Sequence, residues 1–153
     1  MPKVLFLCEH NSARSQMAEA YLNHLGNGKL VAESAGLEPG TLNPRVVAVL
    51  KEDGIDISGK STVGVFELFK SGRQYDAVIA VCSAAVSARC PIFPGRVLRR
   101  NWPFEDPSRL TGSEEEILTQ LRLIRDQIRE KVQQFIKEFE EQGLKIFIQG
   151  SHS

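Results

Sequence analysis

Apolar residues follow two alternating patterns along the chain: short continuous runs, and longer stretches in which they recur every three or four positions. Continuous runs of this length are typical of strands covered on both faces, and they occupy residues 3–7, 30–35, 77–81 and, more weakly, 97–100. Helical spacing predicts helices over residues 15–25, 45–53, 65–70 and from the cap residue Ser113 to beyond Phe139. Strands and helices therefore alternate along most of the sequence.

This alternation predicts an α/β fold with a four-stranded parallel sheet and helices on both faces, because parallel strands need crossover connections that are almost always right-handed. A chain of 153 residues suits one domain, and we expect that catalytic domain to span residues 1–142. The tail, residues 143–153, is expected to be partly flexible: Lys145 to Ile148 can dock on the domain, whereas Ser151 to Ser153 should fray.

Charge and cysteine content limit the possible partners. Basic and acidic residues balance at 19 each, so no long-range positive field attracts nucleic acid or an anionic membrane. The apolar run that begins at Val4 is too short for a signal peptide or a membrane span, which predicts a cytoplasmic protein. In a reducing compartment, three cysteines are more often buried, catalytic or transiently oxidised than structural bridges. We expect the protein to be a monomer.

The segment from Cys8 to Ser15 lies between the first predicted strand and the first predicted helix. Parallel sheets bind ligands at the carboxyl ends of their strands, and a loop that leads into a helix turns backbone N–H groups toward an anion. Cys8 would then lie at the floor of an oxyanion site formed by Glu9, His10, Asn11, Ser12, Ala13, Arg14 and Ser15.

The chemistry of this loop indicates a nucleophile. A helix N-terminus and a nearby cation can lower a cysteine pKa from about 8.5 to roughly 3.5–7.5, so we expect Cys8 to be a thiolate at neutral pH. Arg14 offers a planar set of donors for two oxygens of a tetrahedral anion, and Ser15 can donate a hydrogen bond to the sulfur. The alternative is a buried structural cysteine beside a surface arginine.

Together with Ser34-Ala35-Gly36 and Asp106-Pro107, the loop resembles the low molecular weight protein tyrosine phosphatase family over nearly the whole chain. The resemblance implies that Cys8 attacks the central atom of the oxyanion, that Arg14 stabilises charge, and that Asp106 protonates the leaving oxygen. The apolar flank of Asp106 is expected to raise the pKa of its carboxyl group and keep the acid form available. Glu105 is the rival acid, and a turn-forming role for Asp106 is the alternative.

Two features favour a reductase of this family over a phosphatase. Phosphatases of the family usually carry an aromatic pair after the Asp-Pro turn, where this chain has Ser108-Arg109-Leu110. Cys82 follows a predicted strand, and Cys90 lies eight residues later. The pattern resembles the thioredoxin-coupled arsenate reductases, which implies arsenate reduction in arsenic detoxification. Two incidental buried thiols are the alternative for this pair.

That resemblance implies a relay of three cysteines. Cys8 attacks arsenate, Cys82 attacks the Cys8–arsenic adduct and releases arsenite, and Cys90 then attacks the Cys8–Cys82 disulfide. An external dithiol, in the first place thioredoxin and otherwise a glutaredoxin, would reduce the Cys82–Cys90 disulfide, and no bound cofactor is expected. Two rival functions stay open: hydrolysis of phosphate monoesters such as phosphotyrosine through a Cys8 phosphoenzyme, and a non-enzymatic oxyanion or redox sensor.

The spacing of the relay cysteines adds a conformational prediction. If residues 83–89 are helical, the Cα atoms of Cys82 and Cys90 lie roughly 12 Å apart. A disulfide needs a Cα separation of less than about 7 Å. We therefore expect the small-residue stretch from Ser83 to Ala88 to be a helix or loop of low stability that unwinds on oxidation.

No metal site is predicted. The three cysteines lack the paired spacing of a zinc site. Some relatives in the family bind a potassium ion through residues matched by Asn11, Glu19 and Ser34, but the usual carboxylate is missing near Thr62. One further departure lies at the loop, where the bulky, charged pair Glu9-His10 follows Cys8 at positions that are more often small. His10 is either a proton carrier or a solvated loop residue.

Overall fold

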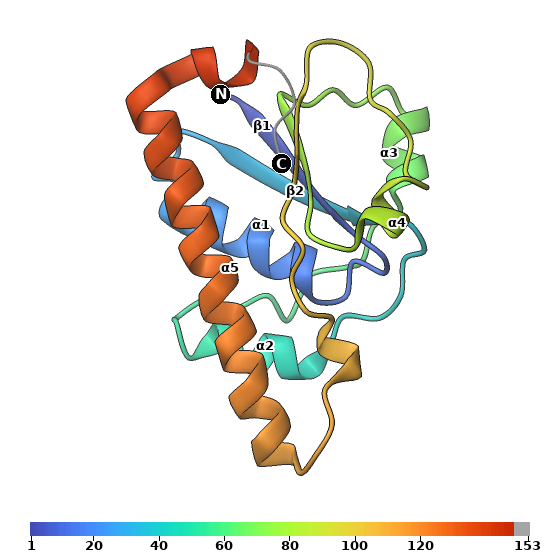
Figure 1. Cartoon of the computed structure of the whole chain (residues 1–153), viewed down its shortest axis with the longest axis vertical. Helices are drawn as coiled ribbons and strands as arrows, with labels where there is room; N and C mark the ends of the chain where they lie inside the picture. The colour runs from blue at the N-terminus through green and yellow to red at the C-terminus, as the bar shows by residue number, and fades with distance from the viewer. Residues whose placement is uncertain (149–153) are drawn as a thin grey trace.

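The structure is a computed structural model that describes residues 1–148 (Figure 1). Every predicted strand and helix is present, and the boundaries differ from the predicted ones by no more than two residues. In chain order the elements are β1 (Lys3–Cys8), α1 (Arg14–Leu25), β2 (Val31–Gly36), α2 (Pro44–Lys51), α3 (Val65–Lys70), β3 (Ala77–Ala80), α4 (Ala84–Ser87), β4 (Leu98–Asn101), η1 (Pro107–Arg109), α5 (Glu114–Gln142) and η2 (Gly143–Ile148).

The strands form one parallel sheet in the order β2-β1-β3-β4, which confirms the predicted four-stranded α/β fold. Cys8 at the end of β1 pairs with Gly36 at the end of β2. On the other side, Leu7 pairs with Ala80, which in turn pairs with Asn101 of β4. All four carboxyl ends therefore meet at one edge of the sheet, where ligands bind in open parallel sheets.

Alternate residues of β1 face opposite sides of the sheet, and each side has its own core. Val4, Phe6 and Cys8 belong to a larger core that α1, α2 and α5 complete. Leu5 and Leu7 belong to a smaller core beneath α3. Figure 1 shows α1, α2 and α5 gathered on one side of the sheet, with α3 and α4 on the other. Helices on both faces were predicted, and the structure confirms them.

The long helix α5 begins with the predicted cap. The Ser113 side chain accepts a hydrogen bond from the backbone of Glu116, and the Glu116 side chain accepts one from the backbone of Ser113. This reciprocal arrangement satisfies two N–H groups that the first turn would leave unpaired. Within residues 1–148, no helix combines the length and the apolar character that crossing a membrane requires.

The segment after α5 docks on the domain. Gly143–Ile148 forms a short 3-10 helix, in which Ile146 is fully buried and Phe147 nearly so. The Phe147 ring lies 5.8 Å from that of Phe139, between centroids. Within Lys145 to Ile148, Ile146 and Phe147 are thus the residues that dock. The predicted fraying of Ser151 to Ser153 lies outside the described residues.

We expect Ile146→Ala to lower the free energy of unfolding by about 2–4 kcal/mol, because it leaves a cavity in the larger core. Leu144→Ala is the matched control, since Leu144 is 67% exposed in the same segment. Its effect should stay within about 0.5 kcal/mol. Urea unfolding followed by circular dichroism measures both, and equal effects of the two substitutions would contradict the docking of this segment.

Candidate active site

Cys8 is the last residue of β1, and only 3% of its surface is exposed. Its sulfur nevertheless meets polar groups. The backbone of Asn11 donates a hydrogen bond to Sγ over 3.2 Å, and the Ser15 hydroxyl oxygen lies 2.7 Å from Sγ. The sulfur thus has the polar surroundings of a reactive cysteine rather than an apolar enclosure.

Asn11 reaches the sulfur because its backbone is left-handed, with φ of 56°. Its fully buried amide is held at both ends. Oδ1 accepts hydrogen bonds from the Val63 backbone (2.9 Å) and the Gln16 amide (3.1 Å). Nδ2 donates to the hydroxyls of Ser15 (2.8 Å) and Ser34 (2.9 Å). The side chain therefore fixes the direction in which the backbone N–H points.

The loop passes directly over the end of β2. A Cβ atom added to Gly36 would lie 2.6 Å from the backbone nitrogen of Asn11, closer than real side chains come. Glycine is therefore required at this position so that the two backbones can approach. The backbone N–H of Leu37 then donates to the Cys8 carbonyl over 3.1 Å. This contact explains why the motif that ends in Gly36 accompanies the cysteine loop.

Arg14 and Asp106 meet at a cleft beside this loop. Arg14 is the first residue of α1 and is 8% exposed. Its Nη1 donates to the Phe104 carbonyl over 3.1 Å, and its Nη2 lies 3.8 Å from Oδ2 of Asp106. The cleft has a volume of about 520 Å³ and is lined by Glu9, Arg14, Ser83, Val86, Pro103, Phe104, Glu105, Asp106 and Arg109. The fold thus brings the predicted arginine and the predicted acid together.

The prediction that its apolar flank raises the pKa of Asp106 is wrong. Burial does raise this pKa, but hydrogen bonds from the backbone and hydroxyl of Ser108 outweigh burial, together with the charges of Arg14 and Arg109. The pKa of Asp106 therefore lies below its ordinary value. The side chain also caps η1, so the turn-forming role is real. Glu105 lines the same cleft but is exposed to solvent.

The remaining loop residues differ in where they point. The His10 side chain is 49% exposed, and its Nδ1 lies 2.9 Å from the Glu38 carbonyl, so the ring belongs to the solvated surface. The carbonyl of Ser12 accepts a hydrogen bond from the Asn43 backbone over 2.9 Å. Ala13 packs into the larger core. These contacts tie the loop to its surroundings on both sides.

Cys82 follows β3 at the same sheet edge and packs in the larger core, which also contains Cys8. Only 1% of its surface is exposed. Burial raises the pKa of the Cys82 thiol to about 11, and the negative charge of a Cys8 thiolate adds to this effect. The guanidinium of Arg14 acts in the opposite direction. Cys82 is therefore a protonated thiol at neutral pH.

Cys90 packs in a different core from the other two thiols. It packs against the smaller core, and it borders a cavity of about 110 Å³ that Leu7 and Phe93 also line. Burial raises the pKa of its thiol as well. Between Cys82 and Cys90, the predicted weak segment is the single-turn helix α4, and none of its residues is buried. All three cysteines are free.

One ion pair at the site was not predicted. The Lys60 ammonium contacts the carboxylate of Glu19, whose side chain is 9% exposed. The other carboxylate oxygen accepts a hydrogen bond from Ser34 over 2.6 Å. Positive charge is thus already supplied at the residues that matched a potassium site in some relatives, and these residues do not fit a bound ion. Sequence carried no signal for this pair, because its members are 41 positions apart.

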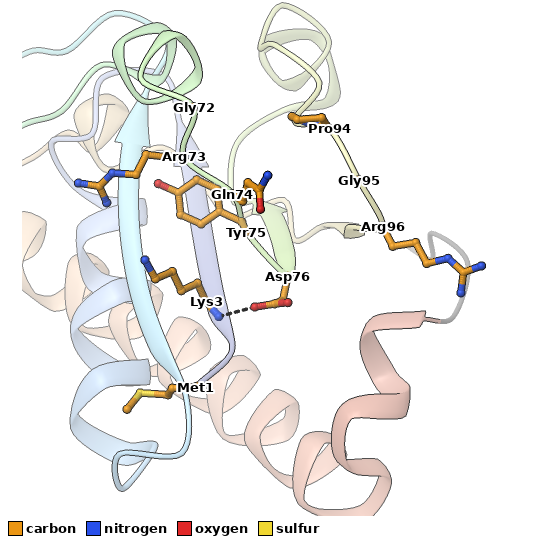
Figure 2. Close-up of a pocket in the computed structure, with 10 residues that line it drawn as sticks. All are labelled: Met1, Lys3, Gly72, Arg73, Gln74, Tyr75, Asp76, Pro94, Gly95 and Arg96. Carbon is orange, nitrogen blue, oxygen red and sulfur yellow. Dashed lines mark hydrogen bonds between the residues drawn. The ribbon is translucent and has the colours of Figure 1, made fainter.

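A larger hollow, of about 650 Å³, lies at the opposite edge of the sheet (Figure 2). It is flanked by Lys3, where β1 begins, and by Asp76, whose carboxylate accepts a hydrogen bond from the Lys3 backbone. None of the predicted site residues lines it. Within residues 1–148, no cluster of three or more histidine, cysteine or acidic side chains is arranged to hold a metal ion.

Fold and site together define the class of protein. The model of the low molecular weight phosphotyrosine protein phosphatase family matches residues 3–145, and the chain belongs to this family. A glutaredoxin arsenate reductase from Synechocystis is 38% identical over 136 residues, which are 89% of this chain and 97% of the relative.

Two solved structures extend this comparison. An arsenate reductase in the phosphate binding state is 34% identical, with a TM-score of 0.70 over 90% of this chain and 98% of the other. A thioredoxin-dependent arsenate reductase from Corynebacterium glutamicum is 29% identical, with a TM-score of 0.61 over 88% of this chain and 63% of the other. Within its family, the chain therefore belongs with the arsenate reductases.

We expect the pH midpoint for alkylation of Cys82 to lie near 11 in the reduced protein. Cys8→Ser should lower this midpoint, because it removes a negative charge beside Cys82. Arg14→Met should raise it, because it removes the opposing positive charge. Mass spectrometry of the peptide that contains Cys82, after iodoacetamide treatment across pH, measures both shifts. Shifts of the same sign in the two variants would contradict this electrostatic account.

Proposed function

We propose that this protein reduces arsenate to arsenite by a relay of three cysteines, Cys8, Cys82 and Cys90. The observation that carries the proposal is the partition of the thiols. Cys82 shares a core with the nucleophile Cys8, whereas Cys90 lies against the other core, toward the surface. In the proposed relay Cys82 attacks Cys8 and therefore has to share its surroundings. Cys90 takes part in the final disulfide, which an external dithiol must reach, and therefore has to lie toward the surface.

In the first step the Cys8 sulfur attacks arsenic, and an arsenate hydroxyl leaves as water after taking a proton from Asp106. Arg14 binds the oxyanion from the cleft and balances its charge. Because the pKa of Asp106 is lowered, this carboxyl is an anion in the empty site at neutral pH. We expect it to take up its proton only when the arsenate dianion is bound beside it.

In the second step Cys82 attacks the Cys8 sulfur. A Cys8–Cys82 disulfide forms, the sulfur–arsenic bond breaks, and arsenic keeps the electron pair and leaves as arsenite. Burial and the negative charge of Cys8 raise the pKa of Cys82, whereas the guanidinium of Arg14 lowers it. Arg14 is therefore the side chain that favours the reactive thiolate form of Cys82.

In the third step Cys90 attacks the Cys82 sulfur, which frees Cys8 and leaves a Cys82–Cys90 disulfide. The two thiols pack against different cores, so the segment between them must rearrange. The single turn α4 has no buried residue, and its unfolding sacrifices little apolar contact. The Ser83 side chain caps this turn by accepting a hydrogen bond from the Val86 backbone over 3.3 Å.

An external dithiol must then reduce the Cys82–Cys90 disulfide. One relative is named for glutaredoxin and one for thioredoxin, and we propose thioredoxin as the donor, with a glutaredoxin as the alternative. The relay needs a compartment that keeps thiols reduced, and we therefore propose a cytoplasmic location. No bound cofactor takes part in these steps.

Hydrolysis of phosphate monoesters is the second candidate function. It needs only Cys8, Arg14 and Asp106, and the family takes its description from phosphatases. The cleft accommodates a tetrahedral anion in either reaction. Two further thiols, Cys82 in the core that contains Cys8 and Cys90 against the other core, favour the reductase, because hydrolysis has no use for them.

We expect Cys8→Ser to abolish arsenite release, and Cys82→Ser to stop it because Cys82 is the thiol that displaces arsenite from Cys8. Cys90→Ser should release one arsenite per protein and then stop as a Cys8–Cys82 disulfide. Arsenite release is measured over many cycles with each dithiol donor, beside hydrolysis of para-nitrophenyl phosphate. If the unchanged protein hydrolyses para-nitrophenyl phosphate and Cys82→Ser does so equally fast, while neither releases arsenite, the hydrolase is favoured. If the unchanged protein neither releases arsenite nor hydrolyses the phosphate ester, the sensor is favoured.

We also expect amide hydrogen exchange in residues 83–88 to become faster when Cys82 and Cys90 form a disulfide, because α4 must unwind to join them. Exchange is compared by mass spectrometry between the reduced protein and the oxidised Cys8→Ser variant. Peptides from α1 serve as the internal control. Equally slow exchange of residues 83–88 in both redox states would count against the rearrangement.

A further inference from the structure

A continuous path of hydrogen bonds runs from the surface to the catalytic sulfur. It begins at the Lys60 ammonium and passes through Glu19, Ser34, Asn11 and Ser15 before it reaches Sγ of Cys8. We infer that Lys60 is a positioning residue: its charge holds the Glu19 carboxylate in place as the acceptor at the outer end of this path, and so supports the residues that orient Cys8. The inference rests on the proposed function only where turnover is concerned.

The direction of the path is fixed at Asn11. The backbone N–H of Val63 can only donate, and it lies 2.9 Å from the amide oxygen of Asn11. That contact, together with the Gln16 amide on the same oxygen, orients the Asn11 side chain. The amide nitrogen must then face Ser15 and Ser34, to which it donates its two hydrogens.

Each serine is left with one hydrogen to donate. Because the Ser15 oxygen accepts from Asn11, the Ser15 hydroxyl hydrogen is available for the Cys8 sulfur, 2.7 Å away. By the same logic Ser34 donates to Oε1 of Glu19 over 2.6 Å. This second bond requires an acceptor at Oε1 of Glu19, and a carboxylate oxygen is one.

Lys60 supplies the positive charge that balances the carboxylate of Glu19. Glu19 is 7% exposed, and burial of a carboxylate without a cation is costly. The Lys60 ammonium binds Oε2, the oxygen that Ser34 leaves free. Its own side chain is 43% exposed, so the cation approaches from the solvent side. A charge tethered to the chain is present at every concentration of salt, unlike a bound ion.

Loss of the charge should disturb the thiol through this path. Without the Lys60 cation the buried Glu19 carboxylate is left unpaired, so the Ser34 hydroxyl that it holds, and with it one partner of Asn11, is held less firmly. Asn11 cannot compensate by turning its amide over, because the Val63 N–H would then meet a second donor. The strained backbone of Asn11, which donates directly to Sγ, would be held less firmly.

The test measures the reactivity of Cys8 itself. In a background of Cys82→Ser and Cys90→Ser, iodoacetamide can alkylate only one thiol. We expect Lys60→Met to slow alkylation of Cys8 at mildly acidic pH by about tenfold, the effect of one hydrogen bond to a charged group. Lys60→Arg should recover most of that rate, since it restores a cation at Glu19.

A matched control separates this effect from a general loss of charge. Lys29 pairs with Glu140 over 3.7 Å at the surface, and Lys29→Met removes a comparable ion pair outside the path. It should leave alkylation of Cys8 unchanged. Circular dichroism at the assay temperature confirms that each variant is folded before the rates are compared.

A double variant tests directly whether Glu19 acts as the hydrogen-bond acceptor for Ser34. In Lys60→Met with Glu19→Gln, the amide oxygen of the glutamine can still accept from Ser34, and no unpaired charge remains. We expect this double variant to alkylate Cys8 faster than Lys60→Met alone. It also guards against misfolding, because it removes the buried charge that would destabilise the single variant.

Two results would overturn the inference: an alkylation rate in Lys60→Met equal to that of the background protein, or a double variant no faster than the single one. In the protein with all three cysteines, Lys60→Met should also lower kcat for arsenate more than it changes KM. Alkylation requires no arsenate, so a failure of the proposed reduction would leave the Lys60 result intact. Conversely, an inert Lys60 would leave the relay standing.

Discussion

The left-handed backbone of Asn11 is the constraint on which the rest of the site depends. Holding a residue other than glycine in this conformation costs about 1 kcal/mol. The four hydrogen bonds to its buried side chain, each worth about 1 kcal/mol, more than offset that strain. The result is a backbone N–H directed at the sulfur of Cys8 without a glycine at this point of the loop.

The parallel sheet provides the second constraint, because it places the cysteines on two faces. Cys8 ends β1 with its side chain toward the larger core, where Cys82 also packs. Cys90 lies against the smaller core on the other face. In the proposed relay, oxidation leaves Cys8 by way of Cys82, since that thiol shares its core. The short helix α4 lies between Cys82 and Cys90, and it is the element that we expect to unwind in that relay.

The charged side chains near the carboxyl edge of the sheet act on their immediate neighbours, as expected for a chain that has no net charge. Arg14 touches the Phe104 carbonyl, approaches Asp106 and lowers the pKa of Cys82. Lys60 neutralises Glu19 on the far side of the same loop. Two local cations thus lie at the ends of these contacts: Arg14 lines the cleft in which we propose that substrate binds, and Lys60 pairs with a residue that supports the loop.

The sequence by itself determined the order of strands and helices, the parallel sheet, the cap at Ser113 and the edge at which Cys8 and Cys82 meet. These features depend on local periodicity and on rules of connection, which neighbouring residues carry. Tertiary structure alone decided the lowered pKa of Asp106, the docking of Ile146 and the contact between Lys60 and Glu19. Each depends on groups far apart in the chain that only packing brings within reach, and no local pattern records that proximity.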